Sequence, residues 1–385
     1  MQHERQVQLV RRVLAHLDAR TTDREPAPTR IPISAYVDPD RFVREHAALF
    51  RGLPLAVAHA SQLSHPGDFV THDASGVPLL IVRGDDGALA AFLNVCRHRG
   101  TQLEAAPCGS KKAFVCPYHA WMYARDGKLA SIPHADGFVG DGGPWIDPAE
   151  RGLVRVPVAT IAGIVFVVPT PGATLDPTWL GPLAEDLAGF GVPAGQVYAP
   201  RVERHALHWK LAIDIFLEAY HLRPTHRTSI YGLFFDNVAL VDPSGPHTRN
   251  VFPKRTIREL ATLPEDTWSL RHHANVLFHI FPNTLVLIEP DHVAVLHLWP
   301  RGPAETLMTS YTLVPEPPTT DKARAYWDAN NAILYDATAE DFAMGASIQR
   351  GLTSGANADV VFGAFEHALA HFHRQIEQTS VTPKQ

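Results

Sequence analysis

The chain has 385 residues, of which 45% are hydrophobic and 19% are charged, a composition typical of folded globular proteins. Its formal net charge is −6 and it has no long run of lysine or arginine. This excludes the basic surface by which proteins bind nucleic acid or an anionic membrane. A chain of this length predicts two or three domains, each with its own hydrophobic core.

The cysteine content and the first residues indicate a reducing compartment. Only three cysteines occur, which is too few for a disulfide framework. The N-terminus mixes apolar with charged side chains and lacks the continuous apolar stretch of a signal peptide. No stretch reaches the roughly 18 consecutive apolar residues of a membrane span. We therefore expect a soluble, cytoplasmic protein with no membrane partner.

The N-terminal region, residues 1–38, is expected to pack against a later domain. Residues 5–20 predict an amphipathic helix, because apolar side chains from Val7 to Leu17 recur at helical spacing. Residues 24–35 contain three prolines and predict an extended connection.

Residues 39–168 predict an all-β domain. A helix is expected first, over residues 38–50, and short strand-like runs separated by turn signals follow it. Asp126-Gly127 predicts the turn of a hairpin. The apolar and β-branched run at 161–169 predicts a buried strand that closes the domain.

A stretch rich in proline, threonine and glycine follows and marks a domain boundary. The remainder, residues 169–385, predicts an α+β domain in which helices cover an antiparallel sheet, because strands precede helices instead of alternating with them. Helices are expected near residues 208–222, 321–350 and 362–378. Strands are expected near residues 275–283, 284–290, 292–300 and 307–315.

The glycines between residues 189 and 195 superficially suggest a dinucleotide-binding loop. Their spacing is GxGxxxG, Pro193 interrupts them, and no strand leads cleanly into them, so the pattern does not fit. The sequence therefore shows no site for NADH or flavin. Redox chemistry in this chain would need electrons from another protein.

Two short loops have the spacing of metal ligands, Cys96-x-His98 and Cys116-x-x-His119. Each loop offers one thiolate and one imidazole, which fits a [2Fe–2S] cluster with both sulfurs on one iron and both nitrogens on the other. The alternative is a tetrahedral zinc site, which uses the same residue types. The iron–sulfur interpretation is favoured, because zinc fingers usually place the two cysteines together and the two histidines together.

This stretch resembles the Rieske domain of the ring-hydroxylating oxygenase family, in the form C-x-H-R-G followed by C-P-Y-H-x-W. The resemblance implies that the cluster ligands are Cys96, His98, Cys116 and His119. Gly100 and Pro117 stand where the loops need tight, fixed geometry. Pro133 lies in a segment that looks like the family's third loop, which covers the cluster.

A second set of candidate ligands lies in the first predicted helix of the second domain. Asp214, Glu218 and His221 fall at i, i+4 and i+7, which would place them on one helical face. Pro224 cannot continue the helix, so His226 is expected to turn back towards the same metal. Two imidazoles and one carboxylate form the facial triad of non-haem Fe(II) sites, which leaves open positions for O2 activation.

Taken alone, the His-x4-His pair is a weak signal, because the chain has 22 histidines. The surrounding W-K-x3-D-x3-E-x-Y-H-x4-H, however, resembles the catalytic signature of the same oxygenase family. The resemblance implies that His221 and His226 bind a mononuclear iron. A stretch similar to the family's E-D-x7-Q segment points to Asp341 as the third ligand, with Glu340 and Asp336 as alternatives.

Glu218 stands where this family has an acidic residue that bridges a cluster histidine of one subunit to an iron-ligating histidine of the next. Aspartate is commoner at that position, and some members that oxidise amine or quaternary ammonium substrates have glutamate there. The alternative is that Glu218 only orients His221 within one subunit.

Apolar residues near these ligands are candidates for a substrate pocket, although such side chains are also usual in protein cores. Together they favour an apolar or aromatic substrate. They are Phe216, Leu217, Tyr231, Leu233, Phe234, Phe235, Phe278, Phe281 and Leu285. Against a wholly apolar pocket stand His247, Arg249 and Arg255, which would either pair with a substrate carboxylate or lie on a loop.

The resemblance, which covers about residues 40–375, implies the terminal oxygenase of a multicomponent Rieske system. Such a protein has one [2Fe–2S] cluster and one mononuclear Fe(II) per chain. It takes electrons from a ferredoxin and/or an NAD(P)H-dependent flavin reductase, and uses O2 to hydroxylate or oxidatively dealkylate a small, aromatic or apolar molecule. The family also implies a head-to-tail homotrimer and is compatible with an accompanying β subunit.

Two alternatives stay open at this point. The same machinery would serve for mono-oxygenation of an amine or quaternary ammonium substrate. A Rieske domain fused to a ligand-binding module would instead be a non-catalytic electron-transfer or ligand-sensing protein. Such a carrier needs no iron triad, so His221, His226 and Asp341 discriminate between an enzyme and a carrier.

Overall fold

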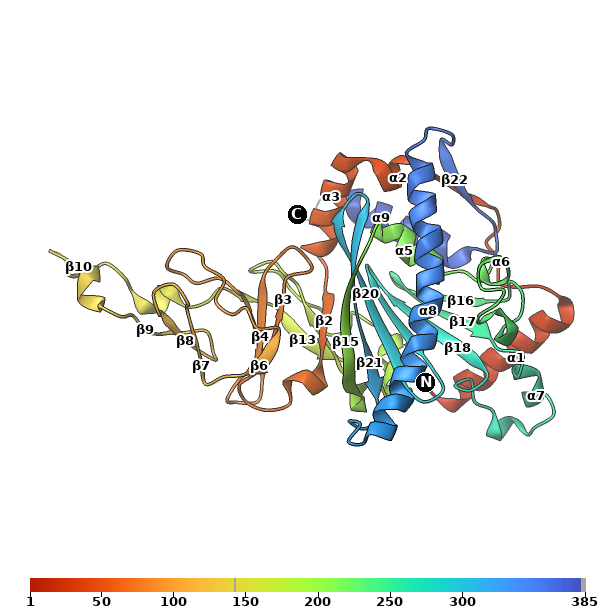
Figure 1. The fold of residues 1–385 in the computed structure, drawn as a ribbon, viewed down its shortest axis with the longest axis horizontal. Coiled ribbons are helices and arrows are strands. Elements are labelled where there is room, and N and C mark those ends of the chain that lie inside the picture. Colours follow the sequence, from red (N-terminus) through yellow and green to blue (C-terminus); the bar gives the residue numbers. More distant parts are fainter. Residues whose placement is uncertain (142, 382–385) are drawn as a thin grey trace. The chain divides into compact units, whose positions relative to one another are not determined.

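The computed structural model, drawn in Figure 1, describes residues 1–141 and 143–381. It divides the chain into two compact units. The larger unit contains Met1–Leu49 and the chain from Leu180 onward, and the smaller unit is Phe50–Trp179. Each division lies 11 residues later than the predicted boundary, at 49 instead of 38 and at 179 instead of 168.

Helix α3 (Pro39–Phe50) accounts for the first of these differences, because it packs within the larger unit. Its Glu45 accepts a hydrogen bond of 2.6 Å from the ammonium group of Lys210, and both side chains are buried. Arg41, one turn earlier on α3, also pairs with Glu45. Buried charges are costly unless they are paired, so these contacts hold α3 against the larger unit.

The smaller unit is built from strands, as predicted. One antiparallel sheet has the order β12-β5-β4-β3-β6, and two further sheets have the orders β13-β14-β2 and β7-β8-β9. A short β10-β11 ribbon completes it. The strands are β2 (Leu55–His59), β3 (Asp68–His72), β4 (Leu79–Arg83), β5 (Leu89–Leu93), β6 (Cys108–Ser110), β7 (Ala113–Val115), β8 (Met122–Ala124), β9 (Leu129–Ser131), β10 (Val139–Gly140), β11 (Gly143–Pro144), β12 (Arg155–Val156), β13 (Val158–Ile161) and β14 (Ile164–Val167).

Strand β4 is buried on both faces, which explains its unbroken apolar sequence. Leu79 and Ile81 belong to one hydrophobic cluster of the smaller unit. Leu80 belongs to the other, which also contains Cys96 and Cys116. The two cysteine loops therefore rest on a packed apolar base.

Two turns of the smaller unit test the hairpin predictions. The turn at Asp126-Gly127 is confirmed: Gly127 has φ +85°, and a side chain there would collide with the ring of Phe92. The buried strand expected within residues 161–169 is confirmed as β14, over the shorter range Ile164–Val167. Ala162 and Gly163 have φ +49° and +83° and reverse the chain, so that β13 and β14 form a hairpin, and β14 is the central strand of the sheet β13-β14-β2.

The larger unit is organised around a seven-stranded antiparallel sheet of order β15-β21-β20-β19-β18-β17-β16. Its strands are β15 (Gln196–His205), β16 (Leu240–Ser244), β17 (His247–Pro253), β18 (Ala274–Ile280), β19 (Thr284–Ile288), β20 (Val293–Gly302) and β21 (Glu305–Val314). The four strands predicted for residues 275–315 are thereby confirmed. A separate ribbon pairs β1 (Thr29–Pro32) with β22 (Asp359–Phe362).

Helices cover this sheet, and the long helix α8 crosses it in Figure 1. The helices are α1 (His3–Ala19), α2 (Ser34–Val37), α4 (Leu183–Gly189), α5 (Trp209–Phe216), α6 (Leu222–Thr225), α7 (Ile257–Leu260), α8 (Asp321–Leu352) and α9 (His367–Val381). The predicted helices at 5–20, 38–50 and 321–350 are confirmed. In the part of the chain that the structure describes, no helix is both long and apolar enough to cross a membrane.

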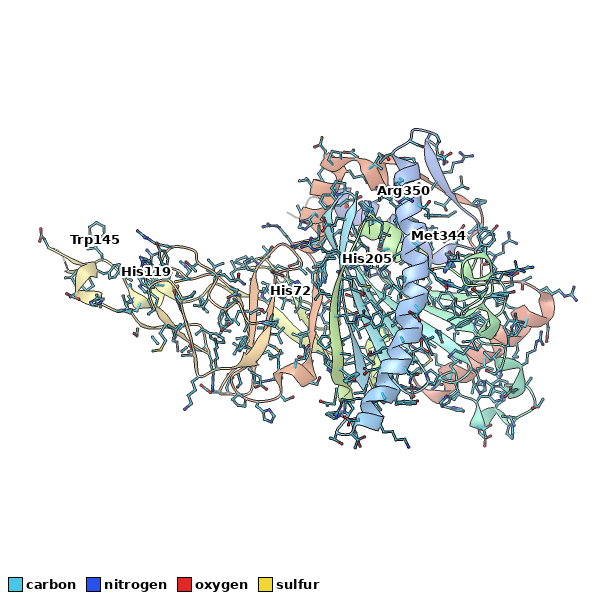
Figure 2. The ribbon with its side chains drawn as sticks, viewed as in Figure 1. His72, His119, Trp145, His205, Met344 and Arg350 are labelled. Atoms are coloured by element: carbon cyan, nitrogen blue, oxygen red, sulfur yellow. The ribbon has the colours of Figure 1, made fainter. Side chains whose placement is uncertain are left out.

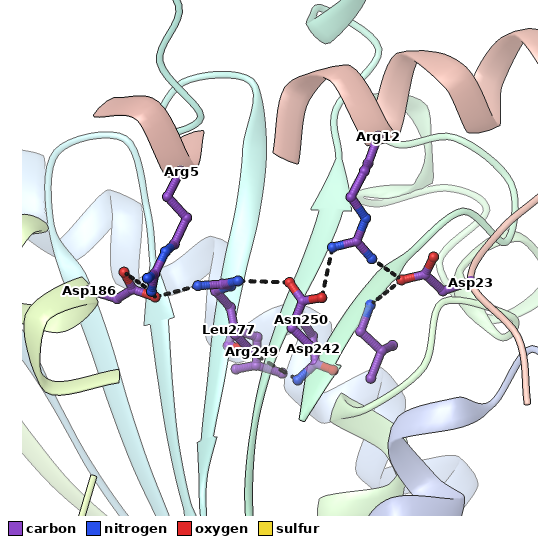
Figure 3. A network of polar contacts seen from close by, with 9 residues as sticks. Arg5, Arg12, Asp23, Asp186, Asp242, Arg249, Asn250 and Leu277 are labelled. Atoms are coloured by element: carbon purple, nitrogen blue, oxygen red, sulfur yellow. Dashed lines mark hydrogen bonds and ion pairs between the residues drawn. The ribbon is translucent and has the colours of Figure 1, made fainter. Parts of the chain in front are cut away.

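A chain of ion pairs fixes α1 to the larger unit (Figure 3). It runs from Arg5 through Asp186 to Arg249, and from there through Asp242 to Arg12, over Nη–Oδ distances of 2.7–3.2 Å apart from the shorter Arg249–Asp186 contact. Although burial opposes ionisation, the two arginines beside Asp242 hold its pKa below the ordinary value. Arg249 is thus held by two aspartates, and the suggestion that it pairs with a substrate carboxylate is wrong.

Candidate metal centres

The two cysteine–histidine loops of the smaller unit have the same local construction. In each loop the cysteine carbonyl accepts a backbone N–H four residues later, from Gly100 and from Ala120, at 3.0 Å. Gly100 and Ala120 have φ of +82° and +57°, which turns the chain back over the histidine. The structure thereby brings the rings of His98 and His119 to a centroid distance of 4.7 Å.

The ligand atoms of these loops fit a metal cluster. Both cysteines are buried, and Nδ1 of His98 and of His119 is buried without a hydrogen-bond partner. A buried nitrogen lone pair without a partner is costly, and metal ligation is the usual way to satisfy it. Burial, with His119 nearby, lowers the pKa of His98 and so favours the neutral imidazole that a metal requires.

Aromatic side chains surround the cluster loops. Trp121 stacks on His98 with the ring planes 6° apart and a centroid distance of 4.8 Å, and Phe138 meets both rings edge-on. The Tyr123 hydroxyl accepts the backbone N–H of Arg97 at 2.9 Å and lies 3.4 Å from the sulfur of Cys96. Burial raises the pKa of Tyr123, so its hydroxyl keeps the proton that it donates to the sulfur.

In the larger unit, His221, His226 and Asp341 come together as predicted. Their ligand atoms lie within 4.8 Å of one another. Oδ1 of Asp341 lies 2.8 Å from Nε2 of His226 and 3.4 Å from Nε2 of His221. The two histidines lie at either end of α6, whereas Asp341 comes from the middle of α8.

The hydrogen bonds behind the two imidazoles show why this group fits a cation. Nδ1 of His226 donates to Glu340 at 2.6 Å, and Nδ1 of His221 donates to Glu218. Each Nδ1 therefore carries the proton and each Nε2 presents a lone pair to Oδ1 of Asp341, which is buried and accepts no hydrogen bond of good geometry. Three electron-pair donors that converge in this way need a positive ion between them.

Electrostatics point in the same direction. Although burial opposes protonation, the carboxylates of Asp341 and Glu218 raise the pKa of His221 to about 10. The site thus attracts positive charge strongly, and a metal ion satisfies the same attraction without a proton.

The predicted helix over residues 208–222 is only partly correct, because α5 ends at Phe216. The Glu218 side chain accepts hydrogen bonds from the backbone N–H groups of Tyr220 and His221, which follow it in the chain. These hydrogen bonds compete with those that would continue the helix. The prediction that Asp214 shares a helical face with Glu218 and His221 is therefore wrong.

Asp214 faces a different set of partners. Tyr36 donates its hydroxyl to Asp214 at 2.7 Å, and Nε2 of His373 lies 2.9 Å from the other carboxylate oxygen. These residues are buried and join α2, α5 and α9. Asp214 therefore stabilises the packing of these helices.

The three candidate-ligand carboxylates of α8 have different surroundings. Asp341 faces the two histidines, as expected for the third ligand. Glu340, which the sequence offers only as an alternative ligand, instead accepts from Nδ1 of His226 and from the hydroxyl of Ser229. Asp336 is exposed and does not join the group.

Two adjoining cavities open at the triad. The inner cavity, about 90 Å³, is bordered by all three candidate ligands, and the outer one, about 380 Å³, shares Asp341 with it. Of the predicted lining residues, Phe216, Leu233 and Phe234 border these cavities.

The remaining lining candidates lie elsewhere. Tyr231, Phe235 and Arg255 border a separate hollow of the larger unit. The others are core residues whose apolar side chains are buried inside the sheet or against it, namely Leu217, Phe278, Phe281 and Leu285. His247 is also buried and accepts the backbone N–H of Phe281 through Nδ1.

The outer cavity contains polar residues that the sequence did not reveal. Asn275 donates to Glu289 at 3.2 Å, and Lys254 lies 3.8 Å from the other oxygen of Glu289. Asp291 lies further along the wall and accepts from the hydroxyl of Tyr326. The only signal for them is that polar residues stand at the ends of otherwise apolar strands.

Sequence comparison identifies the family of this protein. The profile of the Rieske [2Fe-2S] domain matches residues 54–152, and that of the ring hydroxylating alpha subunit (catalytic domain) matches residues 197–379. The chain belongs to the Rieske oxygenase family. It is therefore an oxygenase that uses O2 and binds a [2Fe–2S] cluster and a mononuclear iron. Family membership decides against the zinc protein and the non-catalytic carrier.

Several relatives extend over nearly the whole chain. The carnitine monooxygenase oxygenase subunit of Escherichia coli (strain K12) is 27% identical over 372 residues, which are 90% of this chain and 93% of the relative. The chloroplastic choline monooxygenase of Spinacia oleracea is 28% identical over 90% of this chain and 77% of its own. The chlorobenzene dioxygenase subunit alpha of Cupriavidus sp. is 34% identical, but over 55% of this chain and 47% of its own.

Solved structures agree with this Rieske oxygenase fold. The quaternary ammonium Rieske monooxygenase CntA in complex with L-carnitine superposes with a TM-score of 0.79 and 25% identity, over 92% of this chain and 97% of that chain. Naphthalene 1,2-dioxygenase from Rhodococcus sp. superposes with a TM-score of 0.75 over 98% of this chain and 99% of its own. At 19% identity, the second match concerns the fold alone.

Proposed function

We propose that this oxygenase oxidises a small amine or quaternary ammonium compound, using electrons from a ferredoxin and/or an NAD(P)H-dependent flavin reductase. The observation that carries the proposal is the pair of carboxylates, Glu289 and Asp291, in the wall of the outer cavity. An apolar or aromatic hydrocarbon would cover these charged groups with apolar surface and remove their remaining contact with water, which is costly. This reading replaces the aromatic substrate favoured from the sequence.

The lining of both cavities suits an organic cation. Burial raises the pKa of Glu289, and a bound cation would compensate the cost of keeping this carboxylate ionised. The carbonyl oxygen of Asn275 is buried without a hydrogen-bond partner and offers a further negative dipole. Phe216 and Phe234 border both cavities, and aromatic faces attract quaternary ammonium groups.

The single ammonium group in the wall, Lys254, limits the substrate further. Lys254, which lies 3.8 Å from Glu289, offers a positive charge for a second, anionic group on the substrate. The matching relatives named carnitine monooxygenase and choline monooxygenase support a small substrate with a charged nitrogen.

The metal ligands are part of the proposal. We assign the cluster to Cys96, His98, Cys116 and His119, and the iron to His221, His226 and Asp341. When bound, the cluster stores one electron and the iron offers open positions for O2 and substrate. Glu218 and Glu340 hold the protons on the two Nδ1 atoms, which keeps the Nε2 lone pairs directed at the iron position.

We also propose that the subunits assemble head to tail as a homotrimer and that Glu218 accepts from a cluster histidine of the neighbouring subunit. A carboxylate that already accepts from His221 still has acceptor capacity for such a contact. The solved relative described as giving insight into inter-subunit electron transfer supports this arrangement.

Labelled-oxygen assays with matched substrates test the substrate class. Purified protein with a reductase is given trimethylalkylammonium compounds and their neutral tert-butyl isosteres under 18O2, and products are scored by mass. We expect oxygen from 18O2 to enter only products of the cationic series. Faster turnover of the neutral isosteres, or of an aromatic hydrocarbon, would rule out the proposed substrate class.

A further inference from the structure

A second hollow in the larger unit, about 530 Å³, shares no lining residue with the cavities at the triad. Four arginines line it, Arg20, Arg24, Arg255 and Arg258, and we call it the arginine hollow. The one carboxylate in its wall, Asp236, is already paired with Arg223 at 3.0 Å. Such a concentration of positive charge is unexpected in a chain whose net charge is −6.

The arginines of this hollow are held in place, yet most of their charge is not neutralised. The guanidinium of Arg255 lies 5.6 Å from the ring centroid of Tyr231 and 5.7 Å from that of Phe235. Among the residues that the structure describes, no side-chain hydrogen bond or ion pair of Arg20 or Arg24 is found. These groups are therefore available to an anionic partner.

The arginine hollow borders the neighbourhood of the iron site. Phe365 lines the hollow, and its ring lies 4.8 Å from the ring of Tyr220. Tyr220 is 58% exposed, and its backbone N–H is bound by Glu218. A partner seated in the hollow would thus lie next to the carboxylate that orients His221.

The smaller unit carries a complementary surface beside its cluster loops. The chain from Ala135 to Glu150 contains no lysine or arginine. It exposes an aromatic ring, since Trp145 is 81% exposed, at the same end of the unit as His119 (Figure 2). We call these exposed groups the acidic face, which consists of Trp145 and the carboxylates Asp136, Asp141, Asp147 and Glu150.

The acidic face is connected directly to the cluster loops through Phe138. The ring of Phe138 lies 6.0 Å from that of His98 and 5.8 Å from that of Trp121. Any surface that binds the acidic face is therefore brought close to the cluster histidines.

We propose that the arginine hollow of one subunit binds the acidic face of a second copy of this chain. The inference rests on the head-to-tail assembly proposed above, and it names the surfaces that bring the two metal centres together. Arg258 is already paired with Asp18 at 3.3 Å, so three guanidinium groups remain to meet the four carboxylates. This attraction speeds encounter and fixes the register of the two copies. Trp145 supplies the aromatic anchor that stable interfaces usually bury.

Charge reversal tests the proposal on the metal-loaded, full-length protein. Arg20→Glu/Arg24→Glu changes two arginines for which the described part of the chain offers no side-chain hydrogen bond or ion pair, and Asp141→Arg/Glu150→Arg changes two exposed carboxylates of the acidic face. We expect each double variant to raise the dissociation constant of the assembly at least about tenfold, measured by sedimentation at low salt. Combining all four substitutions should restore assembly, because the charges are then exchanged between the two surfaces.

The control is Arg301→Glu/Arg350→Glu, which changes the net charge equally at exposed arginines outside the hollow. Cluster absorbance and iron content verify that every variant is folded. The proposal would be overturned if both double variants assembled as the wild type does. It would also be overturned if the quadruple variant assembled as weakly as the two double variants. If Arg20→Glu/Arg24→Glu abolished binding of inorganic phosphate but left assembly intact, the proposal would also be overturned. The hollow would then be a site for a small anion. Sedimentation measures the mass of the assembly and not turnover, so a negative result would not affect the proposed substrate class.

Discussion

The cluster loops and the iron triad are built in opposite ways. The four cluster ligands lie within 24 residues, from Cys96 to His119, on two loops of the same construction. The triad instead joins His221 and His226 to Asp341, which follows 115 residues after His226. A site of the first kind depends on local turns, whereas the second depends on the packing of α8 against the rest of the larger unit.

Gly345 shows how close that packing is. It lies one turn after Asp341 on α8, and a Cβ added there would come within 2.6 Å of Leu207 and 3.1 Å of Ile215. A larger residue at this position would force the Leu207 side chain to move. We therefore expect the cluster to tolerate changes in the larger unit that the triad does not, so that single substitutions can separate the two centres.

The largest effect is expected from Asp341→Ala. The variant should lose its mononuclear iron, and its turnover should fall by more than about a hundredfold. Losing a residue that only hydrogen-bonds to a metal ligand costs about 10–100-fold, and losing a ligand should cost more. The cluster spectrum should stay unchanged, because the two ligand sets share no residue. Iron analysis and visible absorbance measure both, with the exposed Asp336→Asn as the control. Iron kept in Asp341→Ala and lost in Glu340→Ala would reverse their assignments.

His98→Cys should leave the triad unaffected and alter the cluster alone. A third thiolate adds negative charge, so the cluster should form with a reduction potential lower by roughly hundreds of millivolts. Electrochemical titration of the purified variant measures this shift. An unchanged potential would mean that His98 is not a ligand.

Glu218→Gln should disconnect the two centres while leaving both in place. An amide offers one acceptor oxygen and a competing NH2, so it cannot hold two imidazole N–H groups as a carboxylate does. In single turnover with pre-reduced protein, cluster oxidation should slow by about tenfold or more, as for other ligand-supporting residues, with metal content unchanged. Wild-type rates would restrict Glu218 to orienting His221 within its own subunit.

Glu340→Gln should weaken iron binding by about 10–100-fold, because the carboxylate fixes the tautomer of His226. Iron affinity is measured by competition with a chelator, and the cluster serves as the internal control. Equal affinity in the variant and the wild type would show that another group, such as the Ser229 hydroxyl, suffices to orient the ring.

The smallest effect is expected from Tyr123→Phe, which removes one hydrogen bond to the sulfur of Cys96. Such a bond contributes about 1 kcal/mol, equivalent to roughly 40 mV for one electron. The cluster potential should fall by that amount, while iron content and substrate affinity stay unchanged. A potential equal to that of the wild type would mean that the hydroxyl does not donate to the sulfur.

Sequence reasoning succeeded where the determining forces are local. The strands of the larger sheet, the hairpin at Asp126-Gly127 and the long helix from Asp321 follow from periodicity and turn chemistry. The cluster loops were recognisable because their ligands and tight turns are adjacent in the chain. The three members of the triad were reached from the resemblance, and the structure brings them together.

The errors occurred where side chains compete with the backbone or meet across the fold. Helix α5 ends early because Glu218 binds the amides of the next residues, which no periodicity can reveal. The polar wall made by Lys254, Asn275 and Glu289 exists only because neighbouring strand ends converge. Phe278 faces the core because of the register of β18, which depends on pairing with distant strands.

Helix α8 serves both as the wall of the substrate cavity and as the mount of the third iron ligand. Ile333, Leu334, Ala337 and Thr338 border the outer cavity and lie three to eight residues before Asp341 on the same helix. Reshaping the cavity through this helix would therefore displace the ligand as well, and apparent changes in substrate preference would be mixed with loss of metal. A library aimed at altered specificity is better placed at Leu233 and Asn275, which border the outer cavity but do not belong to the helix that carries Asp341.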